Sequence, residues 1–122
     1  MKEISVEMRL VMHVLKKNLK LGIDNETISF KEINQKLTEE FTEVSKAIVN
    51  YSYDKTLENL KEVIRETFDL IQVCILILFK SNNISKELGE ENLIEDINIE
   101  HKDKLSDRGW IYETGIEIDV KE

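Results

Sequence analysis

Apolar residues between positions 30 and 80 recur every three or four residues, the spacing that one face of an amphipathic helix requires. The pattern predicts a helix at about 30–50, capped by polar residues within 25–29, and another at about 55–80, with Asp54 as its cap. The same spacing predicts a helix at about 5–20, which Gly22 would end in the left-handed conformation. The apolar face of the helix at 30–50 consists of Phe30, Ile33, Leu37, Phe41, Val44 and Ile48.

The chain after residue 80 is more polar. Residues 81–83, Ser-Asn-Asn, are predicted to end the helix at 55–80, and a fourth helix is predicted at about 85–106 with a weak point at Gly89. In the tail at 110–122, Ile116, Ile118 and Val120 alternate with polar residues. A short hairpin and an extended arm are both compatible with that alternation.

Helices with apolar faces must bury them against one another, so these elements predict an all-α fold, a bundle of four to five helices with a short extended C-terminal tail. The length of 122 residues suits one domain, 1–122. Residues 70–79 are apolar nearly all round the helix, which is more surface than one layer of neighbours within the chain can cover. A homo-oligomer, either a dimer or a tetramer, is therefore predicted.

The composition supports this interpretation and narrows the partners. The absence of proline and the presence of only four glycines favour long helices over sheets, and the glycines form no phosphate-binding loop. The net charge of −8 argues against non-specific binding to a nucleic acid polymer. It is compatible with binding of cations, or of an anionic substrate whose charge a cation masks.

The same sequence predicts a cytoplasmic protein that does not enter a membrane. Its first residues carry charges where a secretory signal needs an apolar run. The most apolar stretch, 68–79, is too short to cross a bilayer and contains Asp69 and Gln72. The single cysteine, Cys74, rules out a disulfide within the chain and suits a reducing cytosol; its place in the apolar run predicts a small core residue.

Acidic residues stand beside the apolar faces of the two central helices. Glu40 and Glu43 lie on the shoulder of the apolar face at 30–50, whereas Glu39 points away from it. Glu66 and Asp69 share a face of the helix at 55–80 with Glu62, and this face becomes apolar further along. A set of acids on a helix is often no more than its solvated face. Acids at the edge of a buried face are costly, however, and a bound divalent cation removes the cost; with oxygen ligands alone it would be Mg²⁺ or Mn²⁺.

These acids form the pattern Glu39-Glu40-x-x-Glu43, a gap of 22 residues, and Glu66-x-x-Asp69. The pattern resembles the EExxE…ExxD signature of the MazG-like superfamily of all-α nucleoside triphosphate pyrophosphohydrolases, related to the dimeric dUTPases and dCTP pyrophosphatases. The resemblance covers about residues 30–79. It implies that Glu40, Glu43, Glu66 and Asp69 hold Mg²⁺ and are the catalytic residues, while Glu39 or Glu62 orients water or a second ion.

Beyond residue 79 the resemblance is weaker and involves a basic stretch. His101-x-x-Lys104-Leu105-x-x-Arg108-Gly109-Trp110 is similar to the part of the family that lies near the substrate phosphates or base. Lys104 and Arg108, four residues apart, can share a helical face and bind phosphate oxygens, and Trp110 can stack on a base. An ordinary charged helix end explains Lys104 and Arg108 equally well. A lone tryptophan is more often an anchor of the core or of an interface.

The resemblance implies hydrolysis of a (deoxy)nucleoside triphosphate to the monophosphate and pyrophosphate by a metal-activated water. Two alternatives belong to other classes. A di-iron carboxylate bundle would need a Glu-x-x-His pair on each of two helices, but Leu10 and Asn98 stand three residues before the two histidines, His13 and His101. A non-catalytic helical protein, whose acids keep an oligomer soluble, remains compatible with the composition.

Overall fold

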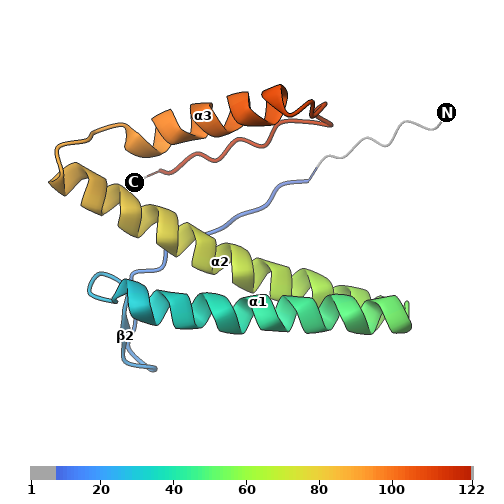
Figure 1. Ribbon diagram of the computed structural model, residues 1–122. Coiled ribbons are helices and arrows are strands. Elements are labelled where there is room, and N and C mark those ends of the chain that lie inside the picture. The colour runs from blue at the N-terminus through green and yellow to red at the C-terminus, as the bar shows by residue number, and fades with distance from the viewer. Residues whose placement is uncertain (1–7, 122) are drawn as a thin grey trace. The chain divides into compact units, whose positions relative to one another are not determined.

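The computed structural model describes residues 8–121, and most of them are helical (Figure 1). A small β-hairpin precedes three helices: β1 (Lys17–Asn18), β2 (Ile23–Asp24), α1 (Phe30–Tyr53), α2 (Leu57–Glu87) and α3 (Leu93–Asp107). The described chain forms two compact units that divide between Asn83 and Ile84, inside α2. Among the described residues, no helix combines the length and the apolar character that crossing a membrane requires.

The hairpin stands where the sequence predicted the end of a helix. Lys17 pairs with Asp24 and Asn18 with Ile23 in antiparallel register. The turn between them is closed by Gly22, whose φ of 66° is left-handed as predicted, although it ends no helix. The predicted helix at 5–20 is therefore wrong for residues 8–20, which contain only β1, turn and irregular chain; residues 5–7 lie outside the described part.

The helix α1 confirms the prediction for residues 30–50 and extends it to Tyr53. Its N-terminus is a capping box, in which the Ser29 hydroxyl accepts the Glu32 backbone N–H at 3.1 Å and the Glu32 carboxylate accepts the Ser29 N–H at 3.4 Å. At the start of α2 the predicted cap, Asp54, is replaced by Thr56, whose hydroxyl accepts the Asn59 N–H at 3.2 Å. Asp54 instead accepts an Asn59 side-chain N–H through its backbone oxygen at 2.8 Å.

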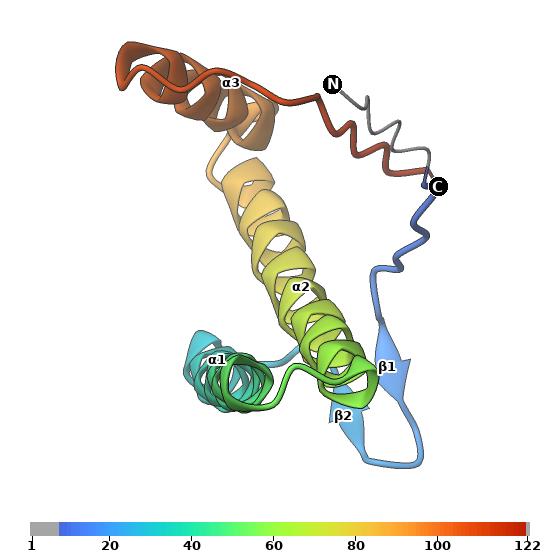
Figure 2. The same cartoon turned by 90° about the vertical axis from the view of Figure 1, so that its right-hand side faces the viewer.

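The helices α1 and α2 lie side by side and run in opposite directions (Figure 1). Figure 2 looks along α1 and shows α2 beside it. Their core contains Ile33, which is only 1% exposed, together with Val73 of α2 and Ile28 from the loop before α1. Partly buried apolar side chains surround these three: Leu37, Leu76 and Ile77. The irregular chain before β1 is also tied to α2, because the Gln72 side-chain amide donates to the backbone oxygen of His13 at 2.6 Å.

The helix α2 does not end at residues 81–83, where a break was predicted. It continues to Glu87 and stops only before Gly89, whose φ of 85° allows the Glu90 N–H to reach the Ser85 oxygen at 2.9 Å. Serine and asparagine each cost a helix less than about 0.7 kcal/mol relative to alanine, so three of them do not stop a long one. Gly89 ends α2 because a glycine can adopt the left-handed conformation without strain.

The second unit contains α3 and the tail. The predicted helix at 85–106 is shorter at its start, since α3 begins at Leu93, and it ends before Gly109, which has a φ of 88°. The tail at 110–121 has no regular secondary structure (Figure 1), in agreement with the extended alternative and not with a hairpin. It is attached to α3 by the Tyr112 hydroxyl, which donates to the Lys102 backbone oxygen at 3.0 Å and contacts the Ser106 hydroxyl.

Candidate functional site

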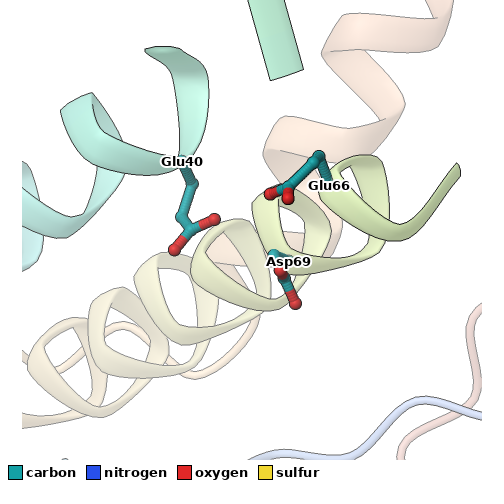
Figure 3. Close-up of side chains that lie close together, drawn as sticks. All are labelled: Glu40, Glu66 and Asp69. Carbon is teal, nitrogen blue, oxygen red and sulfur yellow. The ribbon is translucent and has the colours of Figure 1, made fainter. Parts of the chain in front are cut away.

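Three carboxylates from α1 and α2 approach one another in the first unit (Figure 3). Glu40 comes from α1, and Glu66 and Asp69 come from α2; one oxygen of each lies within 4.8 Å of the others. Glu40 and Glu66 are half-buried, whereas Asp69 is exposed. Within residues 8–121 these three form the only group of acids, histidines or cysteines that is arranged to hold a metal ion. We call Glu40, Glu66 and Asp69 the acidic cluster.

The packing of the two helices explains why these residues meet. Glu40 lies seven residues after Ile33 on α1, and Glu66 lies seven residues before Val73 on α2. Seven residues are about two helical turns, which bring a side chain back to nearly the same face. Because the helices are antiparallel and Ile33 packs with Val73 in the core, two turns along each helix bring Glu40 and Glu66 to the same level. Asp69 joins them because it is three residues from Glu66, on the same face of α2.

The charges of the cluster are not compensated, and the pKa values reflect this. Partial desolvation raises the pKa of Glu40 above its usual value, and the charges of Asp69, Glu66, Glu39 and Glu43 raise it further. Desolvation likewise raises the pKa of Glu66, with smaller contributions from Asp69, Glu43 and Glu62. Every charge that acts on these two carboxyl groups is an acid. A cation bound here would therefore be attracted by all of them.

Other acids to which the sequence analysis gave a role, Glu39, Glu43 and Glu62, act on the cluster but do not belong to it. Glu43 is exposed, and its nearest cation is the Lys46 ammonium at 3.9 Å, one turn along α1. Its charge still contributes to the raised pKa of both Glu40 and Glu66. Glu62 is bound by the Arg65 guanidinium at 2.7 Å. The structure thus gathers three of the four predicted ligands and leaves Glu43 beside them.

The predicted substrate-binding residues belong to the second unit. Lys104 and Arg108 line the same shallow hollow on α3, as their spacing of four residues predicts. The hollow has an acidic lining as well, because Asp96, Glu100, Asp103 and Asp107 line it together with Ile99. Trp110 follows α3 and is 66% exposed, so it is not an anchor of the core in this unit.

Two further residues depart from, or add to, what the sequence predicted. Cys74 is exposed, so the prediction of a small core residue is wrong, although the preceding residue, Val73, is buried. His13 contributes its backbone oxygen to the contact with Gln72, while its side chain is exposed. No further acid among residues 8–121 joins the cluster. Every member of the cluster is therefore a residue that the sequence pattern had identified.

Comparisons with known proteins identify no relative of this chain. No model of a protein family, no curated protein and no solved structure matches the chain. The resemblance to the MazG-like superfamily accordingly depends on the acidic residues, their spacing and the two helices that carry them.

Proposed function

We propose that this protein is a Mg²⁺-dependent nucleoside triphosphate pyrophosphohydrolase of the MazG-like type, which converts a (deoxy)nucleoside triphosphate and water to the monophosphate and pyrophosphate. The observation that carries the proposal is the acidic cluster itself. Two consecutive helices bring oxygens of three carboxylates within 4.8 Å of one another, and no lysine, arginine or histidine belongs to the group. These residues also occupy three of the four positions that the EExxE…ExxD pattern assigns to metal ligands.

The donor atoms of the cluster fit a hard divalent cation. All of them are carboxylate oxygens, which Mg²⁺ and Mn²⁺ prefer, and no thiol or imidazole that would favour zinc belongs to the group. Two oxygens on one Mg²⁺ can be no more than about 4.2 Å apart, given bonds of about 2.1 Å. The spacing of up to 4.8 Å is therefore slightly wide, and small rotations of the glutamate side chains are enough to close it.

Glu43 is the fourth ligand or the base in this proposal. It lies one turn after Glu40 on α1, and its weak exposed pair with Lys46, at 3.9 Å, costs little to break. The ion, when bound, supplies charge neutralisation at the phosphates and makes a bound water more acidic. One carboxylate oxygen that does not bind the ion accepts the proton of the attacking water. No nucleophilic side chain is required.

The proposal extends to substrate binding and to the assembly. Lys104 and Arg108 would bind phosphate oxygens and Trp110 would stack on the base. The complete fold would be the family's bundle of four to five helices, in which a second or further copies of this cytoplasmic protein cover the apolar faces. Exposed apolar residues on both helices support this part: Phe41 and Ile48 on α1, and Leu78 on α2.

The same exposed residues favour one other function. A non-catalytic helical protein of this fold would use that apolar surface to bind a partner or another copy, and its acids would only keep the assembly soluble. In that case the acidic cluster would need no ion and would hydrolyse nothing. The two functions differ in one measurable product.

Pyrophosphate release separates them. The full chain is incubated with a panel of ribo- and deoxyribonucleoside triphosphates and Mg²⁺, and pyrophosphate is measured with and without EDTA. Release that EDTA abolishes, and that Asp69→Asn lowers by about a hundredfold or more, is expected of the enzyme. The control is Glu58→Gln, which removes an exposed acid of α2 that pairs with Lys61 at 3.2 Å, and which should retain full activity. Absence of release with every nucleotide would leave the non-catalytic function.

A further inference from the structure

Residues 8–14 have the side-chain pattern of a β-strand although they belong to no strand. Successive side chains of a strand point to opposite faces, so one face of this segment would carry only apolar residues. The other face would carry Arg9, Val11 and His13. The apolar face consists of Met8, Leu10, Met12 and Val14.

The structure already holds one end of this segment in place for pairing. The segment leads into β1, the Lys16 backbone oxygen accepts the Asn25 N–H at 2.8 Å, and the His13 oxygen accepts the Gln72 amide at 2.6 Å. A hairpin with strands of only two residues is marginal by itself and gains from a further strand. These hydrogen bonds fix the chain just before β1, and a strand that paired with residues 8–14 would continue the two-stranded sheet along the chain.

The tail has a complementary pattern. Ile116 and Ile118 are 87% and 84% exposed, and with Val120 they occupy alternate positions, so that all three would lie on one face of a strand. Glu117 and Asp119 fall on the opposite face. β-branched apolar residues that alternate with polar ones are typical of strands with one buried face. In the second unit this apolar face lies open to solvent.

We propose that residues 114–120 of one chain pair as an antiparallel strand with residues 8–14 of a second copy of this chain. The register that opposes Leu10 to Ile118 also opposes Met8 to Val120 and Met12 to Ile116. All six side chains then lie on one face of the new sheet. A shift by one residue would place the apolar set of one strand on the polar side of the other, so the alternation selects this register or one two residues away.

The charges favour the same register and a partner of this chemistry. With Leu10 opposite Ile118, Arg9 faces Asp119 on the polar side of the sheet, and opposite charges directly across a strand pair are stabilising. The contact of Asp119 with Lys121 in the tail, at 3.9 Å and largely exposed, competes only weakly. The chain from residue 8 into β1 is basic, with Arg9, Lys16 and Lys17, whereas the tail at 114–120 carries the acids Glu117 and Asp119.

Pairing between two copies explains more features of the molecule than pairing of the tail with residues 8–14 of its own chain. Two copies can exchange tails reciprocally, so that a two-fold pair forms both strand contacts at once. The helical pair also exposes apolar residues, including Phe41 and Leu78, that a second copy can cover. This inference concerns assembly, and it holds whether or not the protein hydrolyses nucleotides.

The first test measures self-association of the full chain by sedimentation equilibrium. Ile118→Lys places a charge in the buried face of the pairing and should weaken association at least about tenfold. The matched control is Ile111→Lys, because Ile111 is an equally exposed isoleucine of the tail that lies outside the alternating run. It should change association less than about twofold. Equal effects of the two substitutions, or none from Ile118→Lys, would overturn the proposal.

The second test determines whether the tail pairs with its own chain or with a second copy. In a Cys74→Ser background, a chain with Leu10→Cys is mixed with a chain with Ile118→Cys, and disulfide-linked heterodimers are counted under mild oxidation. Heterodimers should form readily, and much less when Asp119→Cys replaces Ile118→Cys, because that side chain faces the other side of the sheet. Few heterodimers in the mixture, while a chain carrying both substitutions closes its own disulfide at high dilution, would show pairing within one chain and refute the exchange.

Discussion

The α1–α2 pair and α3 both carry acids at helical spacing, but only the pair makes them meet. On α3, acids and bases alternate on one exposed face, where Asp103 and Asp107 flank Lys104 and Arg108 lies beside them. In the pair, Glu40 faces Glu66 and Asp69 across a packed seam, and the charges that act on Glu40 and Glu66 are all acidic. Acids on one helix are readily neutralised by their neighbours. The charges acting on the acids brought together from two helices are all acidic, and this difference separates a solvated surface from a candidate metal site.

The largest expected difference between the two regions concerns stability. Ile33→Ala should lower the free energy of unfolding by about 2–4 kcal/mol, because Ile33 is almost fully buried between α1 and α2. Ile97→Ala on α3 removes a side chain that is about half exposed and should cost less than about 1 kcal/mol. Urea unfolding followed by circular dichroism measures both. Equal losses of unfolding free energy would mean that the packing of α1 on α2 does not distinguish this pair from α3.

Ion binding should depend on pH in the pair. Mn²⁺ binds carboxylates only after they lose their protons, and the pKa of both Glu40 and Glu66 is raised. As the pH falls through these raised pKa values, the affinity for Mn²⁺ should decrease by up to about tenfold per pH unit for each carboxyl that takes up a proton. Calorimetric titrations between pH 4 and 8 would measure the decrease. An affinity that begins to fall only below the usual value of 4.5 would contradict the raised pKa of the two glutamates as the cause of the pH dependence.

The smallest expected effect is on the metal-free fold. Because the folded state raises the pKa of Glu40, it holds that proton more tightly than the unfolded state does. The resulting stability is complete below the unfolded pKa and is lost as the pH rises through the folded one. At pH 7 without metal, Glu40→Gln should therefore leave the fold intact and raise its Tm slightly, since repulsion from Asp69 and Glu66 disappears.

The matched variant on α3 is Asp103→Asn, which should leave the Tm unchanged or lower it, because the acids around Asp103 are accompanied by two cations, Lys104 and Arg108. Thermal unfolding in EDTA compares the two proteins. Strong destabilisation by Glu40→Gln would instead assign that carboxylate to a structural ion pair.

Much of the helical pair could be predicted from the sequence because a single pattern governs it. The regular apolar face from Phe30 to Ile48, the capping residues before it and the acids on its shoulder determine both α1 and the position of Glu40. Glu43 shows the limit of that reasoning. A helical wheel ranks it with Glu40, but only the packing of α1 on α2 decides which of the two reaches Glu66 and Asp69.

The region before the hairpin was predicted wrongly because two periodicities coincide there. Met8, Val11 and Leu15 have helical spacing, while Met8, Leu10 and Met12 alternate as in a strand. Asn18 resolves the ambiguity, since its side-chain oxygen accepts the Leu21 N–H at 3.0 Å and starts the turn that Gly22 completes. A short turn signal outweighs a longer apolar pattern that fits both elements.

The three-residue connection between α1 and α2 has a consequence for how the molecule reaches its folded state. Helices that follow each other so closely find their partners by a short search, because little chain entropy is lost in closing a small loop. The acidic cluster belongs wholly to these neighbouring helices, and its assembly needs neither the hairpin nor the tail. Pulsed hydrogen exchange during refolding should accordingly protect the amides of α1 and the first half of α2 early, so that the acidic cluster would form as soon as these two helices meet.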